Sequence, residues 1–483
     1  MRVVVVGAGM VGHRLVEELA SRDPEGRLEV HLVGEEEYEP YNRILLTEVL
    51  AGRASLRSLT LGAVPDRVQV HRGVAASSID RQAGEVELSD GRRLPYDHLV
   101  LATGAKAWVP PITGLEGRPQ HVHVLRDVDD LRALRARAAN ARHAVVLGGG
   151  VLGLEAACGL AAKGIAVTVV QNEPQVMAGQ LDPQPASVLA GALERNGIRV
   201  RLHVSVDEVV AAYGELVAVR LTDGTVMAAD LMVVSCGVRP ETGLAAGAGL
   251  PVGRGVVVGS DLASPADPRV FAVGDCAQPP EGGSGLLAPG WAQAERLAAR
   301  LTGGPVPSGT AEPARQDIHL KAVGVAAVSL GVRAGAAMPE DRVVSVHDPG
   351  GGRHVDLVVR DGRLVGVTCV GAPEVAAAAG IVLDRGTPTP PDPLSLLAIE
   401  QRTEESSPMR MPAATTVCRC NNVTKKDIVD ACEAGASSVE EVAAATRATT
   451  GCGGCREVVC GIADWLRASD PGLDELAGSV ARP

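Results

Sequence analysis

With 483 residues, the chain is about three times as long as a typical domain, so it can bury several hydrophobic cores without disulfides or a partner. Its formal net charge of −12 argues against binding to nucleic acid or to an anionic membrane, because both ligands need a basic face. No uncharged apolar run reaches the roughly 18 residues of a membrane helix, and the N-terminal run MRVVVVGAG leaves no room for a signal peptide, so we expect a cytoplasmic protein.

A first nucleotide-binding pattern lies at the N-terminus, within residues 3–20. A β-branched run and a helical pattern flank three glycines with GxGxxG spacing: Gly7, Gly9 and Gly12. In such a turn the first glycine makes the bend, the second lets the backbone approach a pyrophosphate, and the third lets the helix pack on the strand. Glu35, at the end of the next predicted strand at 28–36, is placed to accept hydrogen bonds from a ribose. The pattern predicts a dinucleotide site, with an empty glycine-rich turn as the alternative.

A second pattern of the same kind lies within residues 144–164, and a predicted strand at 166–173 follows it. Its glycines have the same spacing: Gly148, Gly150 and Gly153. Glu155 follows them directly and is included in the predicted nucleotide site. No acidic residue stands clearly at the ribose-binding position at the end of this strand, so Glu173 is either the ribose ligand or a solvated loop charge. No arginine or lysine stands there to bind a 2′-phosphate, so we expect NADH, with NADPH as the alternative.

Two further segments connect the first site to FAD: LVLATGA at 99–105 and RVFAVGDCA at 269–277. With them, the chain resembles the two-dinucleotide flavoprotein family of pyridine-nucleotide oxidoreductases over about residues 1–301, with the NAD domain inserted into the FAD domain. The resemblance implies that Thr103 and Gly104 return the chain to the FAD domain and belong to the FAD site. It also places Gly274 and Asp275 in that site, where Asp275 would bind the ribityl hydroxyls. A helix N-cap is a second role for Asp275 and is compatible with the first.

The segment PYNRILLTEVL at 40–50 contains no cysteine, whereas the disulfide reductases and the peroxidases or oxidases of this family carry redox cysteines there. We therefore expect no thiol-mediated chemistry at the flavin. The segment resembles the flavin-side segment of rubredoxin reductases and of the NADH-dependent nitrite reductase large subunit, which implies that Arg43 contacts the FAD phosphates or ring. A surface ion pair is the alternative role of Arg43. The run at 285–301 resembles the same branch, so Trp291 and Gln293 are candidates for the flavin edge, or Trp291 for the core.

Four cysteines form a paired pattern near the C-terminus: Cys418, Cys420, Cys452 and Cys455. In a reducing compartment such a group indicates metal or redox chemistry, because soft thiolates bind iron-sulfur clusters or zinc. Residues 415–466 resemble the bacterioferritin-associated ferredoxin type of 2Fe-2S module, which implies a 2Fe-2S cluster on these four ligands. Structural zinc is the alternative, and the Cys-x-Cys spacing counts against it. Cys432 and Cys460 are expected to pack within the module, although Cys460 could replace one ligand.

The remaining sequence predicts a third domain and a linker. From about residue 316, strand-like runs joined by a turn at 361–362 indicate a small α+β domain. A Pro-rich run at 387–393 and a charged run at 400–415 indicate a linker that sustains neither helix nor strand. The predicted fold class is α/β, with two Rossmann-like FAD/NAD(P)-binding domains, a small α+β reductase C-terminal domain and a small helical 2Fe-2S domain. The expected boundaries are as follows: FAD-binding domain, 1–118 and 240–312; NAD(P)H-binding domain, 119–239; small α+β domain, 313–386; linker, 387–414; 2Fe-2S domain, 415–466; tail, 467–483.

This order of modules resembles the first half of assimilatory NADH nitrite reductases and the electron-transfer subunit of assimilatory nitrate reductases. The resemblance implies an NADH-dependent flavoprotein that passes electrons from FAD to its own 2Fe-2S cluster, with the chemistry carried by the cofactors. The chain ends at Pro483 without the further cysteines that hold sirohaem and a 4Fe-4S cluster in the full nitrite enzymes, so we expect a separate catalytic partner, a molybdenum nitrate reductase. The alternatives are a rubredoxin or ferredoxin reductase serving another acceptor, such as a monooxygenase or a separate nitrite reductase, and a redox sensor or iron-release partner.

Overall fold

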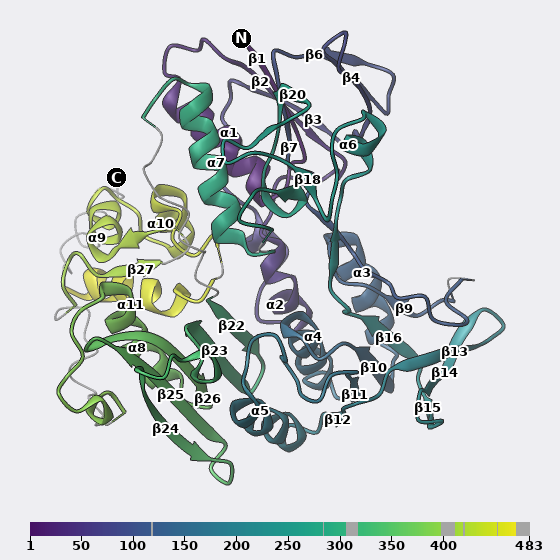
Figure 1. The fold of residues 1–483 in the computed structure, drawn as a ribbon, viewed down its shortest axis with the longest axis vertical. Helices are drawn as coiled ribbons and strands as arrows, with labels where there is room; N and C mark the ends of the chain where they lie inside the picture. Colours follow the sequence, from purple (N-terminus) through teal and green to yellow (C-terminus); the bar gives the residue numbers. More distant parts are fainter. Residues whose placement is uncertain are drawn as a thin grey trace, which may run out of the picture.

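The computed structural model of this protein describes residues 1–116, 119–283, 285–305, 317–397, 411–418, 421–451 and 453–469. Figure 1 shows a sheet with helices α1 (Met10–Arg22) and α7 (Leu287–Leu301) at the top and a second sheet with α4 (Val151–Ala161) at the lower right. An antiparallel sheet with α8 (Pro373–Arg385) lies at the lower left, and a small helical module lies above it (Figure 1). Among the described helices, none combines the length and the apolar character that crossing a bilayer requires.

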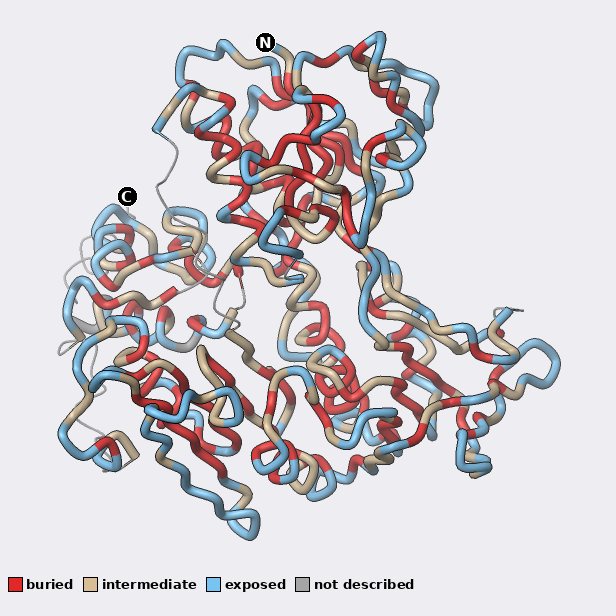
Figure 2. Tube along the Cα trace, viewed as in Figure 1, coloured by how far each residue is buried: buried red, intermediate tan, exposed pale blue. Residues whose placement is uncertain are grey.

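The N-terminal domain is built on six strands: β1 (Arg2–Val6), β2 (Glu29–Gly34), β3 (Val68–Arg72), β7 (His98–Leu101), β19 (Ala263–Ser264) and β20 (Asp267–Ala272). They lie in the order β19-β20-β7-β1-β2-β3, and all neighbours are parallel except β19 and β20. Residues 3–6 of β1 are buried, as expected for a parallel strand covered on both faces. On α1 and α7, Leu15, Leu19 and Leu297 join this core, which Figure 2 shows as a continuous buried region.

The second domain is inserted between two short strands that pair antiparallel, β8 (Ala105–Ala107) on the way out and β17 (Val238–Pro240) on the way back. Its sheet contains five parallel strands: β9 (Val122–His123), β10 (His143–Leu147), β11 (Ala166–Val170), β12 (Arg199–Arg201) and β16 (Leu231–Val234). Their order is β12-β11-β10-β16-β9. Its other helices are α3 (Val128–Ala138) and α5 (Pro183–Arg195). Two glycine-turn βαβ units therefore stand in one chain, β1-α1-β2 and β10-α4-β11.

The two larger domains each carry a small antiparallel sheet. In the N-terminal domain the strands are β4 (Ala76–Asp80), β5 (Glu85–Leu88) and β6 (Arg93–Pro95). In the inserted domain they are β13 (Val206–Ala212), β14 (Glu215–Leu221) and β15 (Val226–Ala228), which project to the right in Figure 1.

The third domain is an antiparallel sheet of five strands: β22 (Ile318–Ala322), β23 (Val325–Gly331), β24 (Arg342–Asp348), β25 (Arg353–Arg360) and β26 (Arg363–Val370). Their order is β22-β23-β26-β25-β24. The predicted turn joins β25 to β26, and both of its residues have positive φ, 48° at Asp361 and 69° at Gly362, as in a type I′ hairpin. The predicted linker is partly structured, because Pro388 bridges to Arg363 and a short 3-10 helix follows at Pro393–Leu396.

The C-terminal module contains three helices, α9 (Lys425–Glu433), α10 (Val439–Thr446) and α11 (Arg456–Ser469), and a short hairpin of β27 (Thr416–Cys418) and β28 (Val423–Thr424). Capping boxes begin two of the helices, Thr424 with Asp427 for α9 and Ser438 with Glu441 for α10. Apolar side chains from all three helices form one small core: Ile428, Val442, Val459 and Ile462. The module is thus helical, as the sequence indicated, with a hairpin in addition.

Candidate functional site

The first glycine turn has the close contacts that only glycine permits. Gly7 has a φ of +116°, and a Cβ built there would lie 2.2 Å from the carbonyl oxygen of Ala102. A Cβ on Gly12 would lie 1.9 Å from the carbonyl oxygen of Gly7. At Gly9, the N-cap of α1, the nearest atom to such a Cβ is Nη2 of Arg43 at 3.7 Å. The turn therefore places the Arg43 guanidinium beside the N-terminus of α1, two groups whose chemistry suits a pyrophosphate.

Arg43 also makes the ion pair that the sequence allowed as its alternative role. Its Nη2 lies 2.9 Å from Oε1 of Glu36, and its guanidinium stacks over the ring of Tyr41 with 5.4 Å to the centroid. The Tyr41 hydroxyl donates to Oε2 of Glu36 at 2.6 Å, and burial raises the pKa of Tyr41. Glu35 is exposed directly after β2, where a ribose could reach it. The ion pair thus fixes Arg43 beside the turn.

Thr103 and Gly104 lie where the chain leaves the N-terminal domain, so the direction predicted for them was wrong: the returning strand is β17. The Thr103 hydroxyl donates to the carbonyl of Glu241 at 2.9 Å, and the Glu241 amide donates to the carbonyl of Gly104 at 2.9 Å. These two bonds hold the outgoing and returning strands together. The pair therefore stabilises the crossing between the two dinucleotide domains.

Asp275 lies in a single 3-10 turn, Gly274–Cys276, and does not cap a helix, because the next helix, α7, begins only at Leu287. Nη2 of Arg126 donates to Oδ2 of Asp275 at 2.9 Å, a contact that the sequence analysis missed. The Gly274 amide donates to Oε1 of Gln293 at 2.8 Å, so Gln293 supports this turn. Asp275 therefore lies at the junction of the two domains, held by a cation from the inserted domain.

The second glycine turn repeats the geometry of the first. Gly148 has a φ of +111°, and a Cβ there would lie 2.2 Å from the carbonyl oxygen of Ser235. A Cβ on Gly153 would lie 2.1 Å from the carbonyl oxygen of Gly148, whereas one on Gly150, the N-cap of α4, would have no neighbour within 4 Å. An open N-terminus of α4 again suits a pyrophosphate. The structure thus brings the three predicted glycines together at one helix terminus.

The predicted acids of this second site have different surroundings. Glu173 is exposed in the loop after β11. Gln171, which the sequence analysis did not select, accepts a hydrogen bond from the Gly149 amide at 3.0 Å. Glu155 is buried, accepting from the Thr47 hydroxyl at 2.7 Å and from the Lys321 amide at 3.0 Å, and burial raises its pKa. Glu155 therefore connects α4 to the N-terminal domain and to β22.

Two of the four predicted cluster ligands lie in the described chain, and the fold brings them together. Cys418 ends β27 and Cys455 precedes α11, and both are buried. A hydrogen bond from the Cys455 thiol lowers the pKa of Cys418 to about 6. Asn421 Nδ2 lies 3.7 Å from the Cys418 sulfur. Cys420 and Cys452 lie outside the described residues. A buried thiol pair that favours the thiolate suits a metal or cluster ligand set.

The C-terminal module contacts the segment that carries Arg43. Asn42, only 2% exposed, donates from Nδ2 to the carbonyl of Thr450 at 2.7 Å and to the carbonyl of Gly451. Its Oδ1 accepts from the amide of Ile44 at 3.0 Å and so caps the short helix Arg43–Leu45. One buried amide therefore joins the predicted flavin-side segment to the predicted cluster loop.

An apolar contact lies beside this amide. A Cβ built on Gly453 would lie 3.0 Å from Cδ2 of Leu45, so the loop backbone packs closely on that side chain. In sequence, Gly453 and Gly451 flank Cys452. Gly451 and Gly453 therefore contact Asn42 and Leu45, which lie within two residues of Arg43 on either side of it.

An ion-pair network fixes the same module to α1, the helix that begins at the first glycine turn. Arg447, at the C-terminus of α10, lies 3.1 Å from Oε1 of Glu18 and 3.6 Å from Oε2 of Glu17. Glu18 also pairs with Arg14 at 3.4 Å, and its side chain is largely buried. The partial burial and the shared carboxylate distinguish this network from an isolated surface pair.

A cavity of about 480 Å³ lies between α1, α7 and α10 at this interface. Trp291 lines it and packs against Met10 and Leu61, with its indole N–H donating to the carbonyl of Met10 at 3.3 Å. Trp291 is therefore a core residue, the second of its two predicted roles. His13 lines the cavity too, and its Nε2 bonds to the carbonyl of Gly62 at 2.8 Å.

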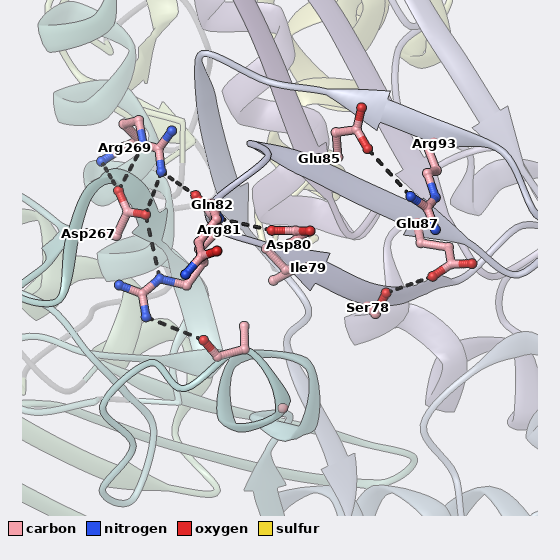
Figure 3. Close-up of a pocket in the computed structure, with 12 residues that line it drawn as sticks. Ser78, Ile79, Asp80, Arg81, Gln82, Glu85, Glu87, Arg93, Asp267 and Arg269 are labelled. Atoms are coloured by element: carbon pink, nitrogen blue, oxygen red, sulfur yellow. Dashed lines mark hydrogen bonds and ion pairs between the residues drawn. The ribbon is translucent and has the colours of Figure 1, made fainter.

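A second cleft, of about 890 Å³, lies over β4, β5 and β20 and contains none of the predicted site residues (Figure 3). Arg269 donates to the carboxylate of Asp267 at 3.1 Å and to the carbonyl of Arg81 at 2.5 Å. Arg81 in turn donates to the carbonyl of Ala266 at 2.5 Å. These arginines bind protein atoms, so their role in the cleft is to hold the small sheet against β20.

Comparison with known proteins agrees with this geometry. Residues 1–295 match the pyridine nucleotide-disulphide oxidoreductase family, and residues 416–464 match the BFD-like 2Fe-2S binding domain. The chain belongs to the pyridine nucleotide-disulphide oxidoreductase family. It is an NAD(P)H-dependent flavoprotein oxidoreductase with a 2Fe-2S domain, which confirms the predicted fold class and cofactor classes and makes structural zinc the weaker alternative.

Particular relatives share most of the chain. It is 36% identical over 468 residues to the NAD(P)H nitrite reductase large subunit of Klebsiella oxytoca, covering 95% of this chain and 48% of that protein. It is 33% identical over 469 residues to the assimilatory nitrate reductase electron transfer subunit of Bacillus subtilis, covering 95% and 59%. The chain thus spans about half the length of the curated relatives it matches. The solved complex of putidaredoxin reductase with putidaredoxin matches with a TM-score of 0.71 at 27% identity, covering 83% of this chain and 96% of that chain.

Proposed function

We propose that the protein takes hydride from NADH onto FAD and passes electrons singly through its own 2Fe-2S cluster to a separate catalytic partner, a molybdenum nitrate reductase. The observation that carries the internal route is the hydrogen-bonded contact of Asn42 with Thr450 and Gly451. It lays the cluster loop on the segment beside Arg43. The choice of partner is supported by the likeness to the Bacillus subtilis electron transfer subunit.

When bound, FAD accepts hydride from the nicotinamide and releases electrons one at a time, and a 2Fe-2S cluster accepts single electrons. The protein residues bind and orient the cofactors. Gly9 and Arg43 offer an open helix terminus and a guanidinium to the pyrophosphate, and Gly150 offers the corresponding terminus to the nicotinamide nucleotide. Asn42 and Leu45 hold the cluster loop in position, because the Asn42 amide donates to its carbonyls and Leu45 packs against its backbone.

Nucleotide choice belongs to the same proposal. The strand β11 ends at Val170, and the residues after it are Gln171, Asn172 and Glu173, with no cation for a 2′-phosphate. We expect kcat/KM for NADH to exceed that for NADPH, measured with ferricyanide as a flavin-level acceptor. A preference for NADPH would contradict this part.

The partner is tested by mixing the purified holoprotein with a purified molybdenum nitrate reductase, NADH and nitrate. We expect nitrite to form at a rate that depends on both proteins and on neither alone. Nitrate reduction by the holoprotein alone would contradict a separate partner, and no nitrite from the mixture would contradict this choice of partner. We place the reaction in the cytoplasm, where NADH is regenerated.

A ferredoxin-type acceptor is the second candidate, favoured by the likeness to putidaredoxin reductase solved with putidaredoxin. Rubredoxin or a 2Fe-2S ferredoxin in place of nitrate reductase distinguishes the two. Faster electron transfer to such a carrier than to nitrate reductase would favour the second candidate.

A further inference from the structure

The side-chain amide of Asn421 lies beside a predicted cluster ligand. Its Nδ2 is 3.7 Å from the Cys418 sulfur, 2.6 Å from the carbonyl oxygen of Arg447 and 3.1 Å from Oγ1 of Thr450. A carbonyl oxygen and a thiolate only accept hydrogen bonds, so the atom that faces them is the amide nitrogen. The amide therefore joins the hairpin that carries Cys418 to the loop that follows α10.

The Cys418 sulfur also has two backbone donors, the amides of Asn421 and Thr449. Thr449 is buried and has a φ of 68°, a left-handed conformation that a β-branched residue rarely adopts. The loop thus holds a strained backbone conformation at a residue whose N–H bonds to the sulfur. Unlike these backbone donors, the Asn421 amide belongs to a side chain, so a substitution can remove it alone.

The three acceptors around Nδ2 of Asn421 outnumber its two hydrogens. The Arg447 carbonyl takes one hydrogen, because it makes the shortest contact, at 2.6 Å. The other hydrogen is shared between the Thr450 hydroxyl and the Cys418 sulfur. The Thr450 hydroxyl therefore competes with the sulfur for this hydrogen.

A hydrogen bond to a ligand sulfur favours the reduced state of a cluster, because the added electron makes the sulfur more negative. We propose that Asn421 is a positioning residue that raises the reduction potential of the 2Fe-2S cluster by donating to Cys418, and that Thr450 limits this effect. The inference rests on the proposed function in one respect, that Cys418 is a cluster ligand. The step concerned is the uptake of one electron, in which no bond to the cluster forms or breaks.

The proposal is tested by redox titration of the full-length holoprotein with mediator dyes, following the EPR signal of the reduced cluster. Asn421→Asp keeps the shape of the side chain, removes both amide hydrogens and adds a negative charge. The equilibrium constant for cluster reduction should fall about ten-fold, a downward shift of about 59 mV for one electron. The matched control is Asn422→Asp, the same change at an exposed neighbour, which should shift the constant by less than about three-fold. An unshifted potential in Asn421→Asp, or an equal shift in both variants, would overturn the proposal.

A second variant, Thr450→Val, should change the potential in the opposite direction. It keeps the branched shape and removes the competing hydroxyl, while the backbone carbonyl of residue 450 still accepts from Asn42. The freed hydrogen goes to the Cys418 sulfur, so the equilibrium constant for cluster reduction should rise about two- to three-fold. General damage to the loop would shift both variants in the same direction, and such a shared direction would overturn the proposal.

Cys418→Ser separates the inference from the proposed function. Loss of the cluster, or a change in its spectrum, supports the ligand assignment, whereas an unchanged cluster would overturn the assignment and the inference with it. Because mediators replace NADH in the titration, a failure of electron transfer to nitrate reductase would not alter the measured potential. A confirmed ligand with no shift in Asn421→Asp would overturn the inference alone.

Discussion

Asn42 is the side chain on which the internal electron route depends, because its amide bonds to the cluster loop while its oxygen caps the adjacent turn. Asn42→Asp keeps the shape and the capping oxygen but cannot donate to the carbonyls of Thr450 and Gly451. We expect cluster reduction by NADH to slow about ten-fold, with flavin reduction unchanged, since an unmade buried hydrogen bond costs about 1–3 kcal/mol. Stopped-flow absorbance separates the two steps.

The control for this variant is Asn140→Asp, an equal change at an exposed residue after α3. It should leave both rates unchanged. Equal rates in Asn42→Asp and the wild type would show that the contact does not set the transfer step.

His13 gives a pH dependence with a definite sign. Burial holds its pKa below the usual 6.5, although Glu17 raises it. The folded state therefore favours neutral His13, and its contribution to stability is present above pH 6.5 and lost as the pH falls below that value. Between about pH 7.5 and about pH 5.5, the wild type should lose up to about 1 kcal/mol more than His13→Gln, measured by urea unfolding. An equal loss of unfolding free energy in the wild type and in His13→Gln would contradict this assignment. So would the same difference from the wild type in the exposed control His143→Gln.

Among the elements, the two glycine turns allow steric fit to be separated from ligand binding. Gly150→Ala adds a methyl group in open space at the N-terminus of α4, so the fold should keep its melting temperature. The KM for NADH should rise about ten-fold, because the methyl group occupies the approach of the pyrophosphate. Gly148→Ala instead meets the carbonyl of Ser235 and should destabilise the domain. The opposite ranking of the two variants, in KM and melting temperature, would contradict the assigned turn geometry.

The contact between α10 and α1 is electrostatic, so charge reversal tests it. Arg447→Glu sets a third carboxylate against Glu17 and Glu18, and cluster reduction should slow about ten-fold as the module leaves its docked position. The matched control is Arg456→Glu, because Arg456 pairs with Glu440 inside the module and does not reach α1. If both variants slow the transfer equally, the effect belongs to the stability of the module and not to docking.

At the scale of the whole molecule, sequence patterns predicted those turns and hairpins whose conformation depends on residues close together in the chain. The GxGxxG spacing predicted both turns, since only glycine fits beside Ala102 and Ser235. The Asp361-Gly362 pair predicted the hairpin. The contacts of these turns with FAD and NADH stay predictions. The prediction that Asp275 caps a helix was wrong. An N-cap residue directly precedes its helix, whereas α7 begins only at Leu287.

The contacts between domains could not be predicted from spacing. Asn42 and Thr450 are 408 residues apart, and a single asparagine carries no signal of a distant carbonyl. The same holds for Arg126 with Asp275 and for Arg447 with Glu18, which pair across domains. Such pairs depend on tertiary packing, and only a structure or co-variation among relatives could identify them.

The most direct test of the account is anaerobic stopped-flow mixing of the holoprotein with NADH at several protein concentrations, following the flavin and cluster bands together. The docked module predicts that flavin absorbance falls first and that the cluster follows in a first-order step whose rate does not change with protein concentration. A cluster that stays oxidised for minutes after the flavin is reduced, or one reduced at a rate proportional to protein concentration, would contradict the internal route.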